Sequence, residues 1–277
     1  MITIFSRPSY IARLKHLSDY TTHRISSRVR GEETALYGKF KLNPFIGYEK
    51  DTLVYVKPTG ITHIKDGDWV DVLDGLIFDR TELLKKRPLI NIIAASQASF
   101  DDIKKRFPNK VILIPHHHIN FNRDVRSKKE IDTCGYIGSP SIVANRIYDN
   151  IGQEVKKMGM KWEVCFNYKT REDAINFFKK IDILIIGAWE LGDPNLYKLP
   201  TKIINAASFG IPSIAYPLSG YQEIKGYYRG IENMEDMKRE IKRLTDKKYY
   251  SHLSSKVLEM SKSYHIKNII KLYRQIQ

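Results

Sequence analysis

The chain has 277 residues, of which 42% are hydrophobic and 28% charged, and it carries a net charge of +15 at pH 7. This length and composition predict a globular protein of one large or two small domains and argue against a disordered chain. The charge predicts an anionic partner, whether nucleotide phosphates, an anionic membrane face or nucleic acid. Cys134 and Cys165 each lie in an apolar run, which predicts free core thiols rather than a disulfide.

The N-terminus, MITIFSRPSYIARLKH, has no long apolar segment, and no run of about 18 apolar residues occurs in the sequence. These features predict a cytosolic protein, with a peripheral position at a membrane as the alternative. We find no G-x-S-x-G sequence, no Walker motif and no Cys/His set spaced for a metal. The sequence therefore argues against hydrolases, P-loop enzymes and dedicated readers of nucleic-acid sequence, and we expect no metal.

Short apolar runs alternate with helical patterns in the N-terminal part. We expect strands over 2–5, 52–56, 69–73, 89–95 and 111–114, helices over 79–86 and 98–107, and a helix that begins at Gly31. Arg28 and Arg30 lie in the basic loop that follows the first strand. Such a loop suits an anion site, and a solvated basic surface is an equally good interpretation.

Asp74 follows the strand expected over 69–73 and precedes Gly75. Ligands of open α/β sheets bind at the carboxyl ends of the strands. The Asp74 carboxylate is therefore a candidate general base for an acceptor hydroxyl. A simple Asp-Gly turn is the alternative interpretation.

Three adjacent histidines, His116, His117 and His118, follow the last of these strands. They do not share a helix face, and no spaced carboxylates or cysteines accompany them, so a zinc site is not expected. His117 is a candidate for the lining of a cleft, with ordinary packing as the alternative. The polar stretch 122–130 predicts a linker between an N-terminal domain, 1–121, and a C-terminal domain, 131–277.

The C-terminal domain shows the same alternation. We expect strands over 133–137, 162–166, 183–186 and 227–231, with a further apolar run after Gly210. Thr170 and Asp173 resemble a capping box at the start of a helix. Pro200 suits the first turn of another helix, and Gly210 suits the left-handed position just past its end.

Two features of this domain predict an anion site. The turn through Gly138 and Ser139 leads from a strand into a helix, where free N–H groups and the positive end of the helix dipole converge. Lys202 lies in the first turn of the helix that begins at Pro200, after a strand of the same predicted sheet.

The segment PTKIINAASFGIPSIA (200–215), followed by SGYQE (219–223), resembles the donor-site signature of GT-B glycosyltransferases. SSRVRGE (26–32) resembles a stretch that borders the acceptor cleft in some of these enzymes, and PHHHINF (115–121) resembles the stretch at their domain crossing. The resemblance covers most of the second domain and the first only loosely. It implies an α/β fold of two Rossmann-like domains that face each other across a cleft.

By this resemblance the C-terminal domain binds a nucleotide sugar without a metal. Lys202, with Thr201 beside it, contacts the donor diphosphate, and Glu223 lies near the ribose or the sugar. From the turns of the chain itself we also expect four residues to supply backbone N–H groups around the diphosphate: Gly138, Ser139, Ser219 and Gly220. The candidate acceptor ligands are Arg28, Arg30 and His117.

The chain departs from the family pattern at two positions. Tyr197 and Asn205 stand where many relatives carry two glutamates eight residues apart. This difference weakens the transfer of ribose contacts, and of retaining stereochemistry, from the branch that carries the glutamates.

The resemblance implies transfer of a sugar from a nucleotide sugar, such as a UDP- or GDP-sugar, to an acceptor hydroxyl, with no other cofactor. Lys202 would then stabilise the charge that grows on the leaving diphosphate. The acceptor is either a membrane-associated glycan, on a lipid carrier or the cell surface, or a nucleic-acid base gripped by the basic surface. A non-catalytic basic binding module and an epimerase of the sugar nucleotide are the alternative functions.

Overall fold

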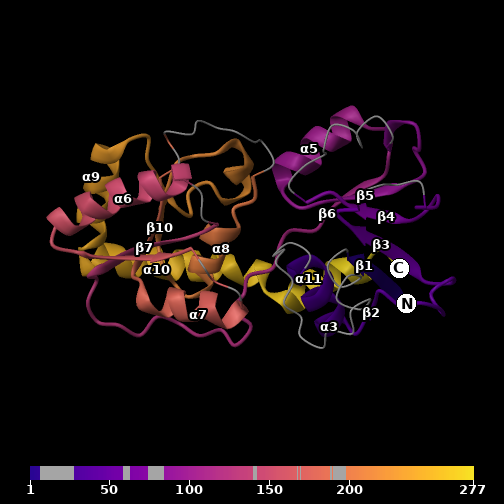
Figure 1. Ribbon diagram of the computed structural model, residues 1–277, viewed down its shortest axis with the longest axis horizontal. Coiled ribbons are helices and arrows are strands. Elements are labelled where there is room, and N and C mark those ends of the chain that lie inside the picture. Colours follow the sequence, from indigo (N-terminus) through magenta and orange to yellow (C-terminus); the bar gives the residue numbers. More distant parts are fainter. Residues whose placement is uncertain are drawn as a thin grey trace. The chain divides into compact units, whose positions relative to one another are not determined.

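The computed structural model describes residues 1–6, 28–58, 63–73, 84–139, 142–166, 168, 170–187, 189 and 198–277. The chain forms two compact units. Unit 1 consists of Met1–His117, Leu196–Leu199 and Ile266–Gln277, and unit 2 consists of His118–Asn195 and Pro200–His265. Each unit holds a parallel sheet, and the two are described separately below (Figure 1).

The sheet of unit 1 has the strand order β2-β1-β3-β4-β5-β6, and all its neighbouring strands are parallel. The register pairs Ile2 of β1 with Thr52 of β3. The strands are β1 (Ile2–Ser6), β2 (Lys41–Leu42), β3 (Thr52–Val56), β4 (Trp69–Asp71), β5 (Asn91–Ala94) and β6 (Val111–Leu113). The helices described in this unit are η1 (Arg28–Glu33), α3 (Thr34–Gly38), α5 (Gln97–Arg106) and α11 (Ile266–Arg274).

Both faces of this sheet are covered, which explains why its strands read as continuous apolar runs. In β3 the side chains alternate: Leu53 and Tyr55 join the cluster that α5 completes, whereas Val54 and Val56 join the cluster that includes α11. The buried residues of α11 recur at helical spacing: Ile266, Ile269, Ile270 and Tyr273. Figure 1 shows α11 beside α3.

The sheet of unit 2 has the strand order β11-β10-β9-β7-β8 and is also parallel throughout. Its register pairs Ser213 of β10 with Leu184 of β9. The strands are β7 (Thr133–Ile137), β8 (Lys161–Cys165), β9 (Ile183–Ile186), β10 (Ser213–Ala215) and β11 (Arg229–Gly230). The helices are α6 (Ile142–Lys157), α7 (Arg171–Lys180), α8 (Thr201–Ser208), η3 (Ser219–Ile224), α9 (Met234–Leu244), α10 (Lys247–Ser261) and η4 (Lys262–Tyr264).

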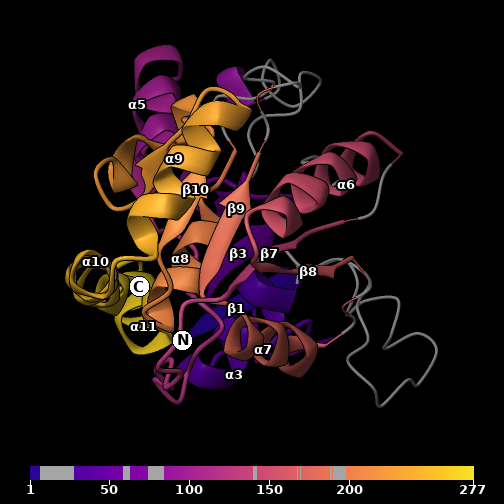
Figure 2. The same ribbon diagram turned by 90° about the vertical axis from the view of Figure 1, so that its left-hand side faces the viewer.

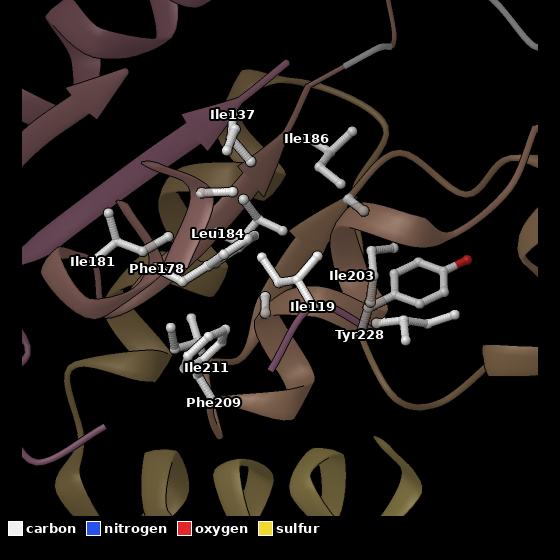
Figure 3. Close-up of a cluster of buried hydrophobic side chains, with 14 of the residues drawn as sticks. Ile119, Ile137, Phe178, Ile181, Leu184, Ile186, Ile203, Phe209, Ile211 and Tyr228 are labelled. Atoms are coloured by element: carbon white, nitrogen blue, oxygen red, sulfur yellow. The ribbon is translucent and has the colours of Figure 1, made fainter. Parts of the chain in front are cut away.

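Helices also cover both faces of the second sheet. The cluster drawn in Figure 3 joins α7 and α8 to one face through residues such as Phe178, Leu184 and Ile203. The other face packs against α6, α9 and α10. Figure 2 shows α6 and α7 on opposite sides of β7 and β8. Unit 2 is therefore a three-layer α/β sandwich.

These elements confirm the α/β fold class that the sequence predicts. The strands expected over 52–56 and 183–186 have those bounds, and the capping box of Thr170 and Asp173 is formed. Gly210 has a φ of 72°, the left-handed conformation expected after α8. Pro200 is the N-cap of α8 rather than its first helical residue. The helix expected over 79–86 lies mostly outside the described residues.

The division of the chain differs from the expected domains. The units meet at His117 and His118 rather than after residue 121, and Ile266–Gln277 belongs to unit 1 instead of the C-terminal domain. The physical reason is the apolar stripe of α11, because Ile269 and Tyr273 complete the core on one face of the first sheet. The helix expected to begin at Gly31 begins at Arg28, as a π-helical turn that continues into α3.

Candidate functional site

The strand order of unit 2 reverses direction between β7 and β9. From β7 the chain passes to β8 on one side, and from β8 it crosses to β9 on the other side. Ligands of open parallel sheets bind at this point, outside the carboxyl ends of the strands. Gly138 and Ser139 follow β7, and Gly187 follows β9. The candidate site is built around these residues.

Lys202 and the end of β7 come together here. The Lys202 Nζ lies 5.6 Å from the centre of the Tyr136 ring, within the range of a cation–π contact. The Tyr136 hydroxyl lies so close to Gly138 that an added Cβ there would stand 2.2 Å from it. Gly138 is therefore needed for the position of Tyr136, and the structure joins two of the candidate donor residues, Lys202 and Gly138, through Tyr136.

The backbone N–H of Gly138, in the turn after β7, bonds to the chain itself rather than pointing to a ligand. The Gly138 N–H, which was expected to face a phosphate, donates to the Cys165 carbonyl at 3.1 Å. Ser139 is exposed. The contribution of Gly138 to this site is thus the space it leaves for Tyr136, not a free N–H.

The remaining candidate donor residues lie in α8 and η3. Thr201 and Lys202 are half-buried in the first turn of α8, and η3 begins with Ser219 and Gly220 after β10. Glu223, also in η3, accepts a 3.4 Å hydrogen bond from the Tyr264 hydroxyl. Burial and the nearby Glu223 carboxylate raise the pKa of Tyr264, so this phenol stays protonated as the donor.

Asn205, one turn after Lys202 on α8, bonds to the backbone of the same unit. Its Oδ1 accepts from the Ile119 N–H at 3.1 Å. Further along α8, the Ser208 carbonyl accepts from Asn120 Nδ2 at 2.7 Å. Both contacts hold α8 to the segment that begins unit 2, so the Asn205 amide acts in the fold where relatives of the resembled family carry a glutamate.

The carboxyl edge of the sheet in unit 1 holds a buried ion pair. Arg30 is 1% exposed, and its Nη2 lies 2.6 Å from Asp71 Oδ2. The same guanidinium donates to the carbonyls of Ile114 and Pro115 at 2.7 and 2.8 Å. Tyr273 of α11 donates to Asp71 at 3.3 Å. Burial raises the pKa of Asp71 against the opposing effect of Arg30.

This arrangement does not suit Arg30 as an acceptor ligand, because its guanidinium is enclosed and engaged within unit 1. A charge buried with its partner can be exposed only by breaking the pair. The role expected for Arg30 therefore has no support in this structure.

The other candidate acceptor residues lie nearby in unit 1. Arg28 is half-buried, with its Nε 4.0 Å from Glu33 Oε1. His117 is buried, and its Nε2 lies 2.9 Å from the Val29 carbonyl and 3.6 Å from Glu33 Oε2. His116 is buried beside them, and no partner for its Nδ1 is found among the described residues. His117 therefore packs against η1 in the structure.

Two positions of interest lie outside the described residues. These are Asp74, the candidate general base, and Tyr197, the first departure from the family pattern. Within the described ranges no group of three or more His, Cys, Asp or Glu side chains is arranged to hold a metal ion. None of the helices described in the structure is long and apolar enough to cross a membrane.

Comparisons with known proteins give the fold. No protein-family model and no curated protein matches the sequence. Among solved structures, a glycosyltransferase from Rickettsia africae is 10% identical, covers 99% of this chain and 88% of its own, and has a TM-score of 0.64. HepE from Anabaena, in complex with UDP, is 9% identical over 99% of this chain and 98% of its own, with a TM-score of 0.60.

TarM is 12% identical over 82% of this chain, with a TM-score of 0.59. The chain spans about half of TarM, 54% of its length. The chain has the GT-B glycosyltransferase fold. At such identities the likeness shows the fold alone, so the activity of this GT-B chain has to be argued from its own residues.

Sequence reasoning missed two features of this GT-B chain. Tyr136 reads as an ordinary core residue of an apolar strand, and nothing local marks its contact with Lys202. Asp71 carries a detectable signal, because a carboxylate inside the apolar run WVDVL requires a buried partner. That partner is Arg30, for which the sequence suggests an acceptor ligand or a solvated basic surface.

Proposed function

We propose that this chain transfers a sugar from a nucleotide sugar to an acceptor hydroxyl, and that unit 2 binds the donor diphosphate at the carboxyl ends of β7 and β9. The observation that carries the proposal is the position of Lys202 in unit 2. Its ammonium lies over the ring of Tyr136, whose hydroxyl stands against Gly138 at the end of β7, where the strand order reverses. The GT-B fold supports the same assignment.

The location of Lys202 in its helix favours an anionic ligand. The first turn of a helix carries partial positive charge, so a lysine there adds to a field that already attracts anions. When the bond between the anomeric carbon and the diphosphate breaks, negative charge grows on the leaving group. A cation that is fixed before the reaction stabilises this charge without reorganising.

The donor of the proposed reaction is a UDP- or GDP-sugar. HepE was solved in complex with UDP, which favours a UDP-sugar as the first donor to test. We propose that transfer needs no metal, so activity should persist in EDTA. The acceptor is a membrane-associated glycan, and the alternative is a nucleic-acid base. The net charge of +15 suits either acceptor, because both lie on anionic surfaces.

A non-catalytic binding module is the second candidate function, and Asn205 is the observation that favours it. The Asn205 Oδ1 accepts a hydrogen bond from the Ile119 N–H. The side chain that stands in place of a family glutamate therefore has a structural role. This reading predicts that the chain binds no nucleotide sugar.

Thermal unfolding with nucleotides tests the proposal. A ligand at a hundredfold excess over its dissociation constant, bound only by the folded state, adds about 2.7 kcal/mol to the free energy of unfolding. We expect UDP or GDP to raise the melting temperature, and the Lys202→Ala variant to bind the same nucleotide about tenfold or more weakly. Lys242→Ala, which removes an exposed lysine of α9, is the matched control.

The result also decides between the two functions. Binding of a nucleoside diphosphate that depends on Lys202, followed by its release during sugar transfer, supports the transferase. If no nucleoside diphosphate or sugar conjugate raises the melting temperature of folded wild-type protein, the transferase proposal is wrong. That result would favour the binding module.

A further inference from the structure

Two tyrosines are stacked beside the proposed diphosphate site. Tyr136 of β7 and Tyr148 of α6 have ring centroids 3.4 Å apart and ring planes inclined by 15°. Both are buried, and Tyr136 is 6% exposed. Phe166, just after β8, contacts Tyr136 edge-on at 5.9 Å. The position of the Tyr136 ring is therefore set by neighbours on both α6 and the sheet.

The Tyr136 hydroxyl is a hydrogen-bond donor at neutral pH. Burial raises the pKa of this phenol, so it keeps its proton. A protonated phenol has one O–H to donate.

The position of the pair indicates where this proton is offered. The Tyr136 hydroxyl stands against Gly138, at the end of β7. The strand order reverses between β7 and β9. The Lys202 ammonium lies over the face of the same Tyr136 ring. A hydroxyl proton and an ammonium at one place suit an oxyanion.

We propose that Tyr136 is a donor-binding residue in its own right: its hydroxyl donates to an oxygen of the diphosphate, and its ring holds the Lys202 ammonium in place for the same group. The inference rests on the proposed function and adds a residue to it. Tyr148 serves as the positioning residue, because its ring is stacked on the Tyr136 ring.

The first test compares UDP with uridine, which lacks the phosphates. Tyr136→Phe keeps the ring and removes the hydroxyl. We expect it to bind UDP about tenfold more weakly than wild type while binding uridine equally well, because one hydrogen bond to a charged group is lost. Tyr249→Phe removes a hydroxyl from a half-buried tyrosine of α10 to which we give no role in donor binding, so its UDP affinity should stay within about twofold of wild type.

The outcomes separate this inference from the proposed function. If wild type binds UDP and Tyr136→Phe binds it equally well, the inference is overturned and the proposed function stands. An equal loss for UDP and uridine overturns it too, since that result shows only a structural role. If wild type binds neither UDP nor GDP, the proposed function fails and the inference fails with it.

A double-mutant cycle tests the role of the ring. Tyr136→Leu removes the aromatic face, and Lys202→Ala removes the cation. If the ring holds the ammonium for the diphosphate, the two changes together weaken UDP binding by less than the product of their separate effects. Independent effects that multiply would overturn this part of the inference. Circular dichroism and thermal unfolding of each variant establish that the folded proteins are being compared.

Discussion

The two sheets each carry a cation at their carboxyl edge, and the surroundings of these cations differ. Arg30 in unit 1 is enclosed, with Asp71 at 2.6 Å and two backbone carbonyls as further partners. Lys202 in unit 2 is half-buried and lies over an aromatic ring. An aromatic face attracts a cation without neutralising it, whereas a carboxylate at this distance cancels most of its charge.

This difference shows why topology alone does not locate a site. Both sheets are parallel, and both present strand ends where ligands of such sheets bind. In unit 1 the cation is bonded to the chain itself and ties η1, β4 and the end of β6 together. In unit 2 the cation lies over the Tyr136 ring, and this aromatic contact does not itself neutralise it. Changing the surroundings of Arg30 and of Lys202 separately tests this difference.

The largest effect is expected from Asp71→Asn. This change leaves the Arg30 guanidinium buried without its counter-charge and weakens the contact from Tyr273. Breaking a buried pair in this way costs about 3–5 kcal/mol of folding free energy. Urea unfolding followed by circular dichroism measures the loss.

Asp124→Asn is the matched control for that experiment. The Asp124 carboxylate bonds Lys179 at 2.8 Å, but both side chains are more than a third exposed. An exposed ion pair contributes little to stability, so the loss should be much smaller than for Asp71→Asn. Equal losses in the two variants would contradict a structural role for the pair in unit 1.

A smaller effect is expected from Gly138→Ala in unit 2. The added methyl group would stand 2.2 Å from the Tyr136 hydroxyl, so the ring has to move. Crowding of this kind costs about 1–3 kcal/mol. We also expect weaker UDP binding, because the ring under Lys202 is displaced. Isothermal titration and denaturant unfolding measure the two effects.

Gly230→Ala in β11 gives the comparison for Gly138→Ala. No atom lies within 4 Å of a Cβ added at Gly230. This variant should match wild type in UDP affinity and differ little in stability. If Gly138→Ala behaves in the same way, the contact between Gly138 and Tyr136 does not control the site.

Local signals in the sequence predicted much of the fold. The apolar runs at β3 and β9, the capping box at Thr170 and the left-handed Gly210 each depend on a few neighbouring residues, and all were found. The ion pair of unit 1 depends on residues that lie far apart in the sequence. Arg30 is 41 residues from Asp71, and Tyr273 is 202 residues from it. No periodicity or spacing encodes such contacts.

The same limit applies to the candidate site. Lys202 was predicted because it belongs to a recognisable segment, and its role in donor binding stays a prediction. Tyr136 was not, because a tyrosine in an apolar strand usually completes a core. Only the folded chain brings its ring under Lys202 and its hydroxyl against Gly138. For Arg30 the local sequence is misleading. A basic residue in a loop suggests a ligand, whereas the structure shows the Arg30 side chain enclosed by unit 1.

The smallest effect at neutral pH is expected from His116→Gln in unit 1. Burial lowers the pKa of His116 well below its usual value, and Arg30 and His117 act in the same direction. The imidazole is therefore neutral in the folded protein. Below a pH of about 6.5 the unfolded chain takes up a proton there that the folded chain does not, so stability falls as the pH falls.

Replacing His116 removes this contribution. The melting temperature of wild type should fall more steeply between about pH 7 and pH 5 than that of His116→Gln, while the two differ least near pH 8. Because carboxylates titrate in both proteins, the difference between the two curves is the quantity to compare. Parallel curves would mean that His116 takes up its proton over the same pH range in the folded and unfolded chains, which would contradict a neutral, buried imidazole beside Arg30.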